Sequence, residues 1–272
     1  MHVDMKLLAL AVFSVALSLS RAAFAQGEPA VTAAPVIIES DQTRPKRPLV
    51  LDDGVADLHV GLGMTISGEP KLSFADVVHM PIGADVGLGN RFEVGGLLNL
   101  ALKPDVASTL TARARVDLGL PHRMLAVGAS VTLPLWWISE RLGPHRALPL
   151  SFEIPAFRFD GSEAAIQAVL RWIYLLQEGP DSKALDLGLA GIFRISNGAF
   201  AHMDIGSEAA DLKTKNMHLF AGLGLGYAMT TNFLGKVCLR TGDLAAFSHW
   251  EVLILVVNTS GGKANSASGE WN

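Results

Sequence analysis

The residue types that most often bind metals or act as nucleophiles are scarce in this chain and badly spaced for such work. Its eight histidines include no pair with the spacing of a zinc site, and its single cysteine, Cys238, has no second thiol for a disulfide. His202 and Asp204 share a face of an expected strand, a pairing that is structural far more often than catalytic. No Gly-x-Ser-x-Gly segment or convincing Ser/His/Asp set occurs. The sequence therefore predicts no enzyme, no metal and no cofactor.

A glycine-rich segment, residues 222–226, reads Gly-Leu-Gly-Leu-Gly. A phosphate-binding loop would need a helix directly after it, because the N–H groups at the N-terminus of that helix hold the anion. No helical pattern follows, and the alternation is that of a strand. We interpret these glycines as strand residues.

Charged side chains on the polar faces of expected strands are the remaining candidates for function. One hypothesis is an interior ionic network that satisfies these charges and fills a narrow barrel; the other is a pore lining that selects solutes by charge. We favour the network. The candidate lumen-facing charges are Glu93, Arg113, Arg115, Asp117, Glu153, Arg171, Asp186, Arg194, Lys236 and Arg240.

The elements that position these charges show a period of two. Between Leu110 and Leu120 every even residue is apolar, and the odd residues include Arg113, Arg115 and Asp117. Successive side chains of a strand point to opposite faces, so this segment is a ribbon with one apolar and one charged side. Residues 125–135 repeat the alternation after a turn at 121–123, which predicts an antiparallel hairpin of membrane-spanning length.

The same alternation recurs from Val55 onward and predicts about twelve strands, within about 10 to 14. Residues 164–177 would also suit a helix, but we prefer a strand that turns Ile166 and Trp172 outward and Gln167 and Arg171 inward. The expected strands are 55–67, 71–88 (with Pro81 as a kink or break), 92–100, 110–120, 125–135, 148–159, 163–176, 185–194, 199–207, 219–227, 232–241 and 248–258.

Composition agrees with a membrane barrel. Half of the residues are apolar, only 18% are charged, and the mean hydropathy is +0.34. A water-soluble domain has about 25% charged residues. No run of about 18 apolar residues supplies a membrane helix, so the apolar residues must cross in alternating strands. The net charge of −4 argues against nucleic acid as a partner.

The N-terminus has the anatomy of an export signal. Lys6 precedes an apolar stretch at residues 7–18, and Ala23-Phe24-Ala25 forms a small-x-small cleavage site. We expect a signal peptide at 1–25, a flexible periplasmic linker at 26–53, a transmembrane barrel at 54–258 and a polar tail at 259–272.

Short turns alternate with longer connections, as at the two rims of a membrane barrel. The expected turns are 89–90, 121–123, 196–198 and 230–232; the longer connections are 138–147, 178–183, 207–216 and 241–249. Trp136, Trp137, Trp250 and Tyr227 lie near strand ends, where an interfacial aromatic girdle would form.

The segment from Pro81 to Leu102, with its Gly89-Asn90-Arg91 turn followed by Phe92-Glu93-Val94-Gly95-Gly96-Leu97, resembles a recurring hairpin. It is similar to the repeated unit of outer-membrane barrels of myxobacteria and other proteobacteria, including the phenol-degradation-pathway (MetA-like) barrel proteins. The resemblance implies a barrel in the outer membrane that passes small molecules. One departure is the polar tail after the last apolar strand, where such barrels usually end on an aromatic residue.

The sequence thus predicts an all-β protein, a closed antiparallel transmembrane β-barrel in the cell outer membrane. Its function would be that of a narrow channel or structural membrane protein that passes or binds small solutes. Its partners would be outer-membrane lipid, the barrel-insertion machinery and small solutes. Two alternatives are a secreted soluble β-sandwich that binds a ligand and a barrel enzyme that acts on membrane lipids.

Overall fold

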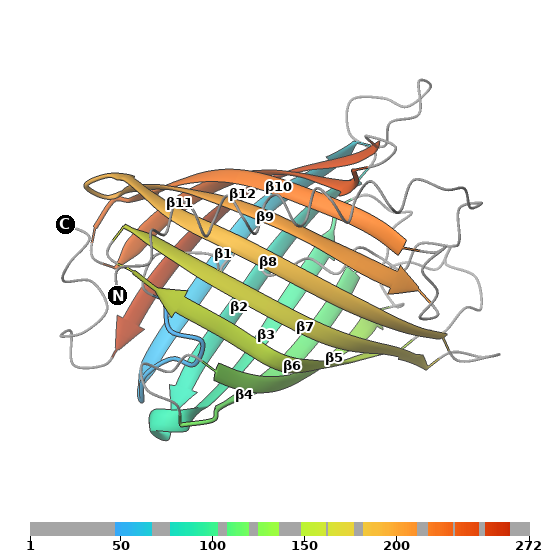
Figure 1. Cartoon of the computed structure of the whole chain (residues 1–272), viewed down its shortest axis with the longest axis horizontal. Coiled ribbons are helices and arrows are strands. Elements are labelled where there is room, and N and C mark those ends of the chain that lie inside the picture. Colours follow the sequence, from blue (N-terminus) through green and yellow to red (C-terminus); the bar gives the residue numbers. More distant parts are fainter. Residues whose placement is uncertain are drawn as a thin grey trace, which may run out of the picture.

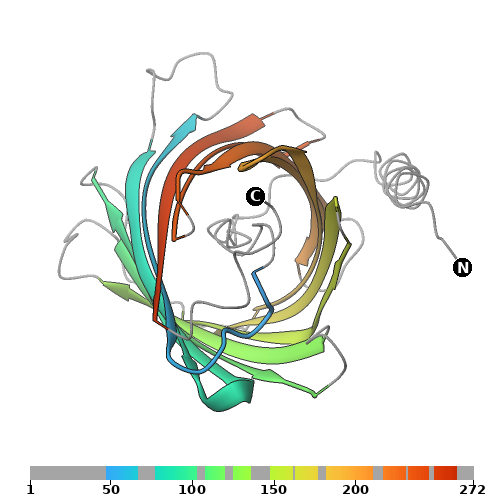
Figure 2. The same ribbon diagram turned by 90° about the vertical axis from the view of Figure 1, so that its left-hand side faces the viewer.

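The computed structural model describes residues 47–66, 77–102, 108–119, 125–135, 148–161, 163–176, 182–210, 217–230, 232–244 and 248–261. These residues form one closed antiparallel barrel in which each strand pairs with its neighbours in sequence and β12 pairs with β1 (Figures 1 and 2). The strands are β1 (Val55–Ile66), β2 (Val77–Leu88), β3 (Phe92–Ala101), β4 (Ser108–Asp117), β5 (Leu125–Leu135), β6 (Leu148–Asp160), β7 (Ala164–Leu176), β8 (Ser182–Ser196), β9 (Ala199–Ala210), β10 (Met217–Ala228), β11 (Phe233–Asp243) and β12 (Ser248–Gly261); a 3-10 turn, η1 (Gly89–Arg91), joins β2 to β3.

The predicted fold class and the twelve strands are confirmed. The segment that also suited a helix is β7, and Pro81 lies within an unbroken β2. The polar residues after Asn258 continue the last strand, because β12 pairs with β1 as far as Gly261. The part of the chain that the structure describes contains no candidate membrane-spanning helix.

The outer face of the barrel is apolar. Leu58, Val60 and Leu62 of β1 are 40–49% exposed, whereas Asp57 and His59, which alternate with them, are buried. Leu223 and Leu225 of β10 are even more exposed, at 56% and 62%. A continuous apolar outer surface of this kind would be unfavourable in water, and it matches the hydrocarbon interior of a bilayer.

The two rims of the barrel differ, as the turn lengths predict. The connections η1, 197–198 and 229–232 are short and share one end of the barrel with the start of β1 and the end of β12. Asn197-Gly198 makes the two-residue turn, and Gly198 has a φ of 76°, which glycine adopts at little cost. We call the rim that carries these short connections the short-turn end, and the opposite rim the long-loop end.

Exposed aromatic side chains gather where strands meet the short-turn end. Tyr227 is one of them, as predicted, and it is joined by phenylalanines that the prediction did not include. The outward aromatic residues near this rim are Phe92, Phe157, Phe159, Tyr227 and Phe233. Trp250 lies at the start of β12, near the opposite rim, whereas Trp136 and Trp137 fall outside the described residues.

Part of the barrel interior is apolar, which the sequence analysis did not predict. Two clusters of buried residues lie on the inner face, toward the short-turn end. The first contains Ala165, Ile192, Phe200, Leu234, Leu255 and Val257, and the second contains Leu49, Val50, Ala126 and Val169. Leu49 and Val50 precede β1, so a segment outside the sheet packs into the barrel.

The exposed face of β10 gives a direct test of the membrane assignment. Leu223 lies near the middle of the strand, so Leu223→Arg would place a charge near the bilayer midplane. We expect the folded barrel to lose about 2–4 kcal/mol in bilayers. Urea titration of the protein in lipid vesicles measures this loss. The control is His218→Arg on the inner face opposite Glu208, which should leave the midpoint nearly unchanged.

Candidate functional site

The inward positions of the strands carry most of the charges that the sequence singled out. Glu93, Arg113, Arg115, Asp117, Arg171, Asp186 and Lys236 are buried on the inner side of the barrel wall, and Arg194 and Arg240 are half-buried there. Glu153 lies in β6, but its side chain falls outside what the structure describes.

Five of these residues follow one row of paired positions across the strands. The row runs from β3 to β8, and its charges alternate in sign. Gly128 is its uncharged position in β5. The charges, in order, are Glu93, Arg115, Glu153, Arg171 and Asp186. Ion pairs form along it: Arg115 Nη1 lies 3.6 Å from Glu93 Oε1, and Arg171 Nη1 lies 3.7 Å from Asp186 Oδ2. The register thus brings half of the predicted site into a single ladder of opposite charges.

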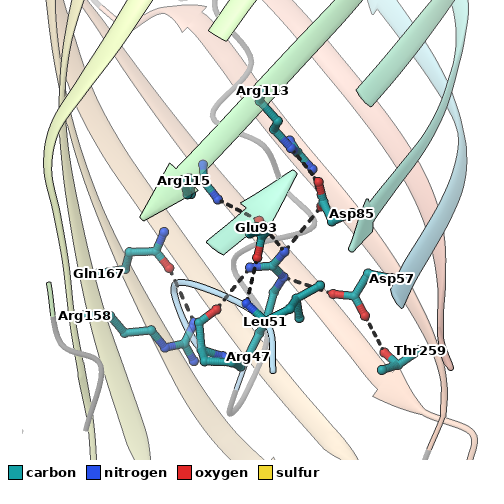
Figure 3. A network of polar contacts seen from close by, with 11 residues as sticks. Arg47, Leu51, Asp57, Asp85, Glu93, Arg113, Arg115, Arg158, Gln167 and Thr259 are labelled. Carbon is teal, nitrogen blue, oxygen red and sulfur yellow. Dashed lines mark hydrogen bonds and ion pairs between the residues drawn. The ribbon is translucent and has the colours of Figure 1, made fainter. Parts of the chain in front are cut away.

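The charges of β1 to β4 form a dense network at the short-turn end (Figure 3). Arg113 donates to Asp85 through Nε, at 2.7 Å, and also through Nη2. Asp57 accepts a hydrogen bond of 2.7 Å from the Thr259 hydroxyl, which ties β1 to β12. Three carboxylates of this network, Asp57, Asp85 and Glu93, are at most 1% exposed. Buried carboxylates are stable only with such compensating partners.

A residue from outside the strands completes the network. Arg47 reaches Asp57 at 3.1 Å, Asp85 at 3.3 Å and Glu93 at 3.2 Å, and its side chain is 1% exposed. One guanidinium therefore joins three successive strands, β1, β2 and β3. A guanidinium suits this role because its five N–H donors can serve several carboxylates at once.

The residues after Arg47 bury apolar side chains inside the barrel. Leu49, Val50 and Leu51 are at most 3% exposed, and the Leu51 N–H donates to Glu93 at 2.9 Å. Asp53 then accepts a bond of 2.6 Å from the Gly89 N–H at the rim. Seen along the axis, this chain turns inward before β1 (Figure 2). We call residues 47–53 the plug; they are the last part of the segment 26–53 that the sequence predicts to be a linker, and 26–46 lie outside the described residues.

A second group of polar residues lies further toward the long-loop end. Arg240 Nε is 3.8 Å from Asp204 Oδ2, and the Arg240 guanidinium stacks over the Phe220 ring at 4.3 Å. His79 is within 2.9 Å of Glu251 and 3.0 Å of Asn99, so β2, β3 and β12 are also joined there. Mixed charges therefore line the barrel along much of its length.

Inner glycines make room for these side chains. The register shows which side chain uses the space beside each glycine. A Cβ at Gly63 would collide with His79, one at Gly83 with His59, and one at Gly224 with His202. In each case the glycine is directly opposite the ring on the neighbouring strand.

This pairing predicts a measurable coupling. Gly63→Ala should displace the His79 ring and weaken its bonds to Asn99 and Glu251, at a cost of about 1–3 kcal/mol. Combining it with His79→Ala should destabilise the barrel less than the sum of the two single changes. Urea unfolding of the four proteins in lipid measures the coupling. Additive losses would contradict the packing of this pair.

Several members of the site were missed by sequence reasoning. Asp57, His59, Asp85 and Glu251 lie on the inner faces of their strands, but they were not among the candidates. His202 and Asp204 do lie together, with Nε2 and Oδ1 3.7 Å apart. For Arg47 there was no signal, because the segment around it has no periodicity. Within the described ranges, no group of histidine, cysteine and acidic residues could hold a metal ion.

A closed barrel with an apolar exterior and a charged interior defines the class of transmembrane β-barrels. Neither a family model nor a curated protein matches the chain. The resemblance to myxobacterial and MetA-like barrels therefore stays a prediction.

Solved structures of outer-membrane barrels share the fold. The NanC porin aligns with a TM-score of 0.55 at 8% identity, over 74% of this chain and 98% of its own. The KdgM porin in complex with disordered oligogalacturonate gives 0.52 at 9%, with the same coverage. The COG4313 outer membrane channel from Pseudomonas putida F1 gives 0.51 at 12%, over 80% and 99%. At such low identity the likeness shows the fold alone.

Proposed function

We propose that the chain is an outer-membrane channel for small solutes, and that the plug closes it at the short-turn end in the state described. The observation that carries this proposal is the closed barrel, apolar outside and charged inside. The fold shared with porins and with an outer-membrane channel supports it. Export through a signal peptide at 1–25 and insertion by the barrel-insertion machinery belong to the same proposal.

The difference between the rims supports an orientation. In bacterial barrels short turns face the periplasm and longer loops face outward. The plug then closes the periplasmic mouth, and the half-buried charges around Asp204 and Arg240 are reached from outside. Solutes would enter from the long-loop end and meet the plug last.

The alternatives fare less well. A soluble two-sheet sandwich is contradicted by the single closed sheet. A lipid-modifying barrel enzyme is favoured by no feature of the described residues, and we propose passage without chemistry. The oligogalacturonate of the KdgM complex is a poor guide to the solute of this chain, because carboxylates alternate with cations inside this barrel.

The test is conductance in a planar bilayer. We compare the full chain with a released variant, Arg47→Ala together with Val50→Asn. The first change removes the ion pairs of Arg47, the clamp that holds the plug, and the second puts a polar amide at the buried position of Val50. The wild-type chain should stay mostly closed, and the released variant should conduct steadily. If both proteins insert, shown by a heat-dependent gel shift, and the released variant carries no current, the channel proposal fails.

A further inference from the structure

We propose that Asp57, Asp85 and Glu93 form a binding subsite for a solute with a guanidinium or ammonium group, and that Arg47 occupies this subsite in the closed state. The inference rests on the proposed function, since the subsite becomes available only when the plug leaves the barrel. We call these three residues the carboxylate triad.

The group seen at the triad is itself a guanidinium. Each carboxylate lies 3.1–3.3 Å from an Arg47 nitrogen, and the three come from three successive strands. Figure 3 shows the three side chains turned toward the Arg47 head group from the barrel wall. The contacts therefore fit a planar cation with several N–H donors. A guanidinium group has this geometry and binds carboxylates well.

The wall holds the triad through partners other than Arg47. Asp85 is bonded to Arg113, Asp57 to the Thr259 hydroxyl, and Glu93 is paired with Arg115. These partners belong to β4 and β12, which are part of the barrel and stay when the plug leaves. The subsite is thus preformed, and a ligand would not have to order it.

The balance of charge favours a cation. In the described network the three carboxylates of the triad face Arg47, Arg113 and Arg115. Without Arg47, three carboxylates would face two guanidiniums. The excess carboxylate gives the open mouth a local negative charge, so a cation is bound there in preference to an anion or a neutral solute.

The position of the triad makes the subsite part of the solute path. The three residues lie on the inner face at the short-turn end, beside the plug that closes it. A solute that leaves through this end must pass them. The triad would therefore select cationic solutes at the narrow mouth of the open channel.

The experiment uses methylguanidinium chloride as the probe and the full-length released variant in detergent and in bilayers. Calorimetric titration should show binding to the released variant and none to wild type, where Arg47 fills the subsite. In the released background, Asp57→Asn and Glu93→Gln should each weaken the binding at least about tenfold. The matched control is Asp160→Asn. Asp160 is paired with Arg158, and the Asp160 side chain is 40% exposed.

The two readouts separate this inference from the function on which it rests. Binding that depends on the triad, together with block of the potassium current by methylguanidinium, supports both. Triad-dependent binding without any current supports the subsite and overturns the channel. Two results would overturn the subsite. One is a current that methylguanidinium does not block, with no binding of the probe to the released variant. The other is equal binding in the triad variants and the control.

Discussion

Replacing Arg47 with alanine should open the channel. The change removes one partner from three buried carboxylates, and loss of one partner of a buried ion pair costs about 3–5 kcal/mol. The cost falls on the closed state, because the carboxylates are hydrated once the plug leaves. Each 1.4 kcal/mol is a factor of ten, so the closed-to-open ratio should fall by roughly 100- to 4000-fold. Single-channel recording gives this ratio as the open probability.

The control for this prediction is Arg194→Ala. Arg194 lies at the same end of the barrel and also pairs with a carboxylate, but Glu163 is 3.9 Å away and its side chain is 71% exposed. Exposed pairs contribute about 0–1 kcal/mol, so the open probability should hardly change. An equal response to both substitutions would show that Arg47 is not a specific clamp.

Replacing Asp85 with alanine should destabilise the whole barrel. Asp85 is fully buried between Arg47 and Arg113, so its loss leaves two guanidiniums without a shared carboxylate. We expect a loss of about 3–5 kcal/mol in unfolding free energy. Urea titration of the protein in lipid vesicles, followed by tryptophan fluorescence, measures it.

A matched substitution distinguishes burial from charge. Glu163→Ala removes a carboxylate 3.9 Å from Arg194, but the Glu163 side chain is 71% exposed, and we expect a loss of less than about 1 kcal/mol. Combining Asp85→Ala with Arg113→Ala should restore part of the stability, because the guanidinium that loses Asp85 is then removed as well. Equal losses for Asp85→Ala and Glu163→Ala would contradict the network.

The strands and their faces could be predicted because the alternation of a membrane barrel is local. Leu110 and Arg113 already show in sequence which side faces lipid and which faces the interior, and β4 confirms it. β7 was harder, since its composition also suits a helix. The period-two interpretation placed Gln167 and Arg171 inward, and both are buried.

Contacts across the barrel could not be predicted, because they depend on register and closure. The polar face of one strand does not show that Glu93 lies beside Arg115, nor that His79 covers Gly63. The inner apolar cluster is a similar case: Leu255 and Val257 alternate with Ile254 and Val256, so both faces of β12 are apolar and the sequence does not mark the inner one.

The plug was beyond prediction for another reason. Its residues have no periodicity, and the prolines of the segment 26–53 indicate an irregular structure. Arg47 binds carboxylates that lie 10, 38 and 46 residues away in sequence, and its role depends on them. An arginine before the first strand of a barrel therefore gives no signal until the strands that surround it are placed.

The orientation of the two strand faces, one toward lipid and one toward the lumen, is tested most directly by fluorescence quenching in bilayers. A bimane label is placed at Leu223→Cys on the exposed face of β10, or at His218→Cys on its inner face, with Cys238 replaced by serine. Brominated acyl chains should quench the label at 223, and aqueous iodide should quench the label at 218. Quenching of both labels by the same agent would show that the faces do not separate lipid from lumen.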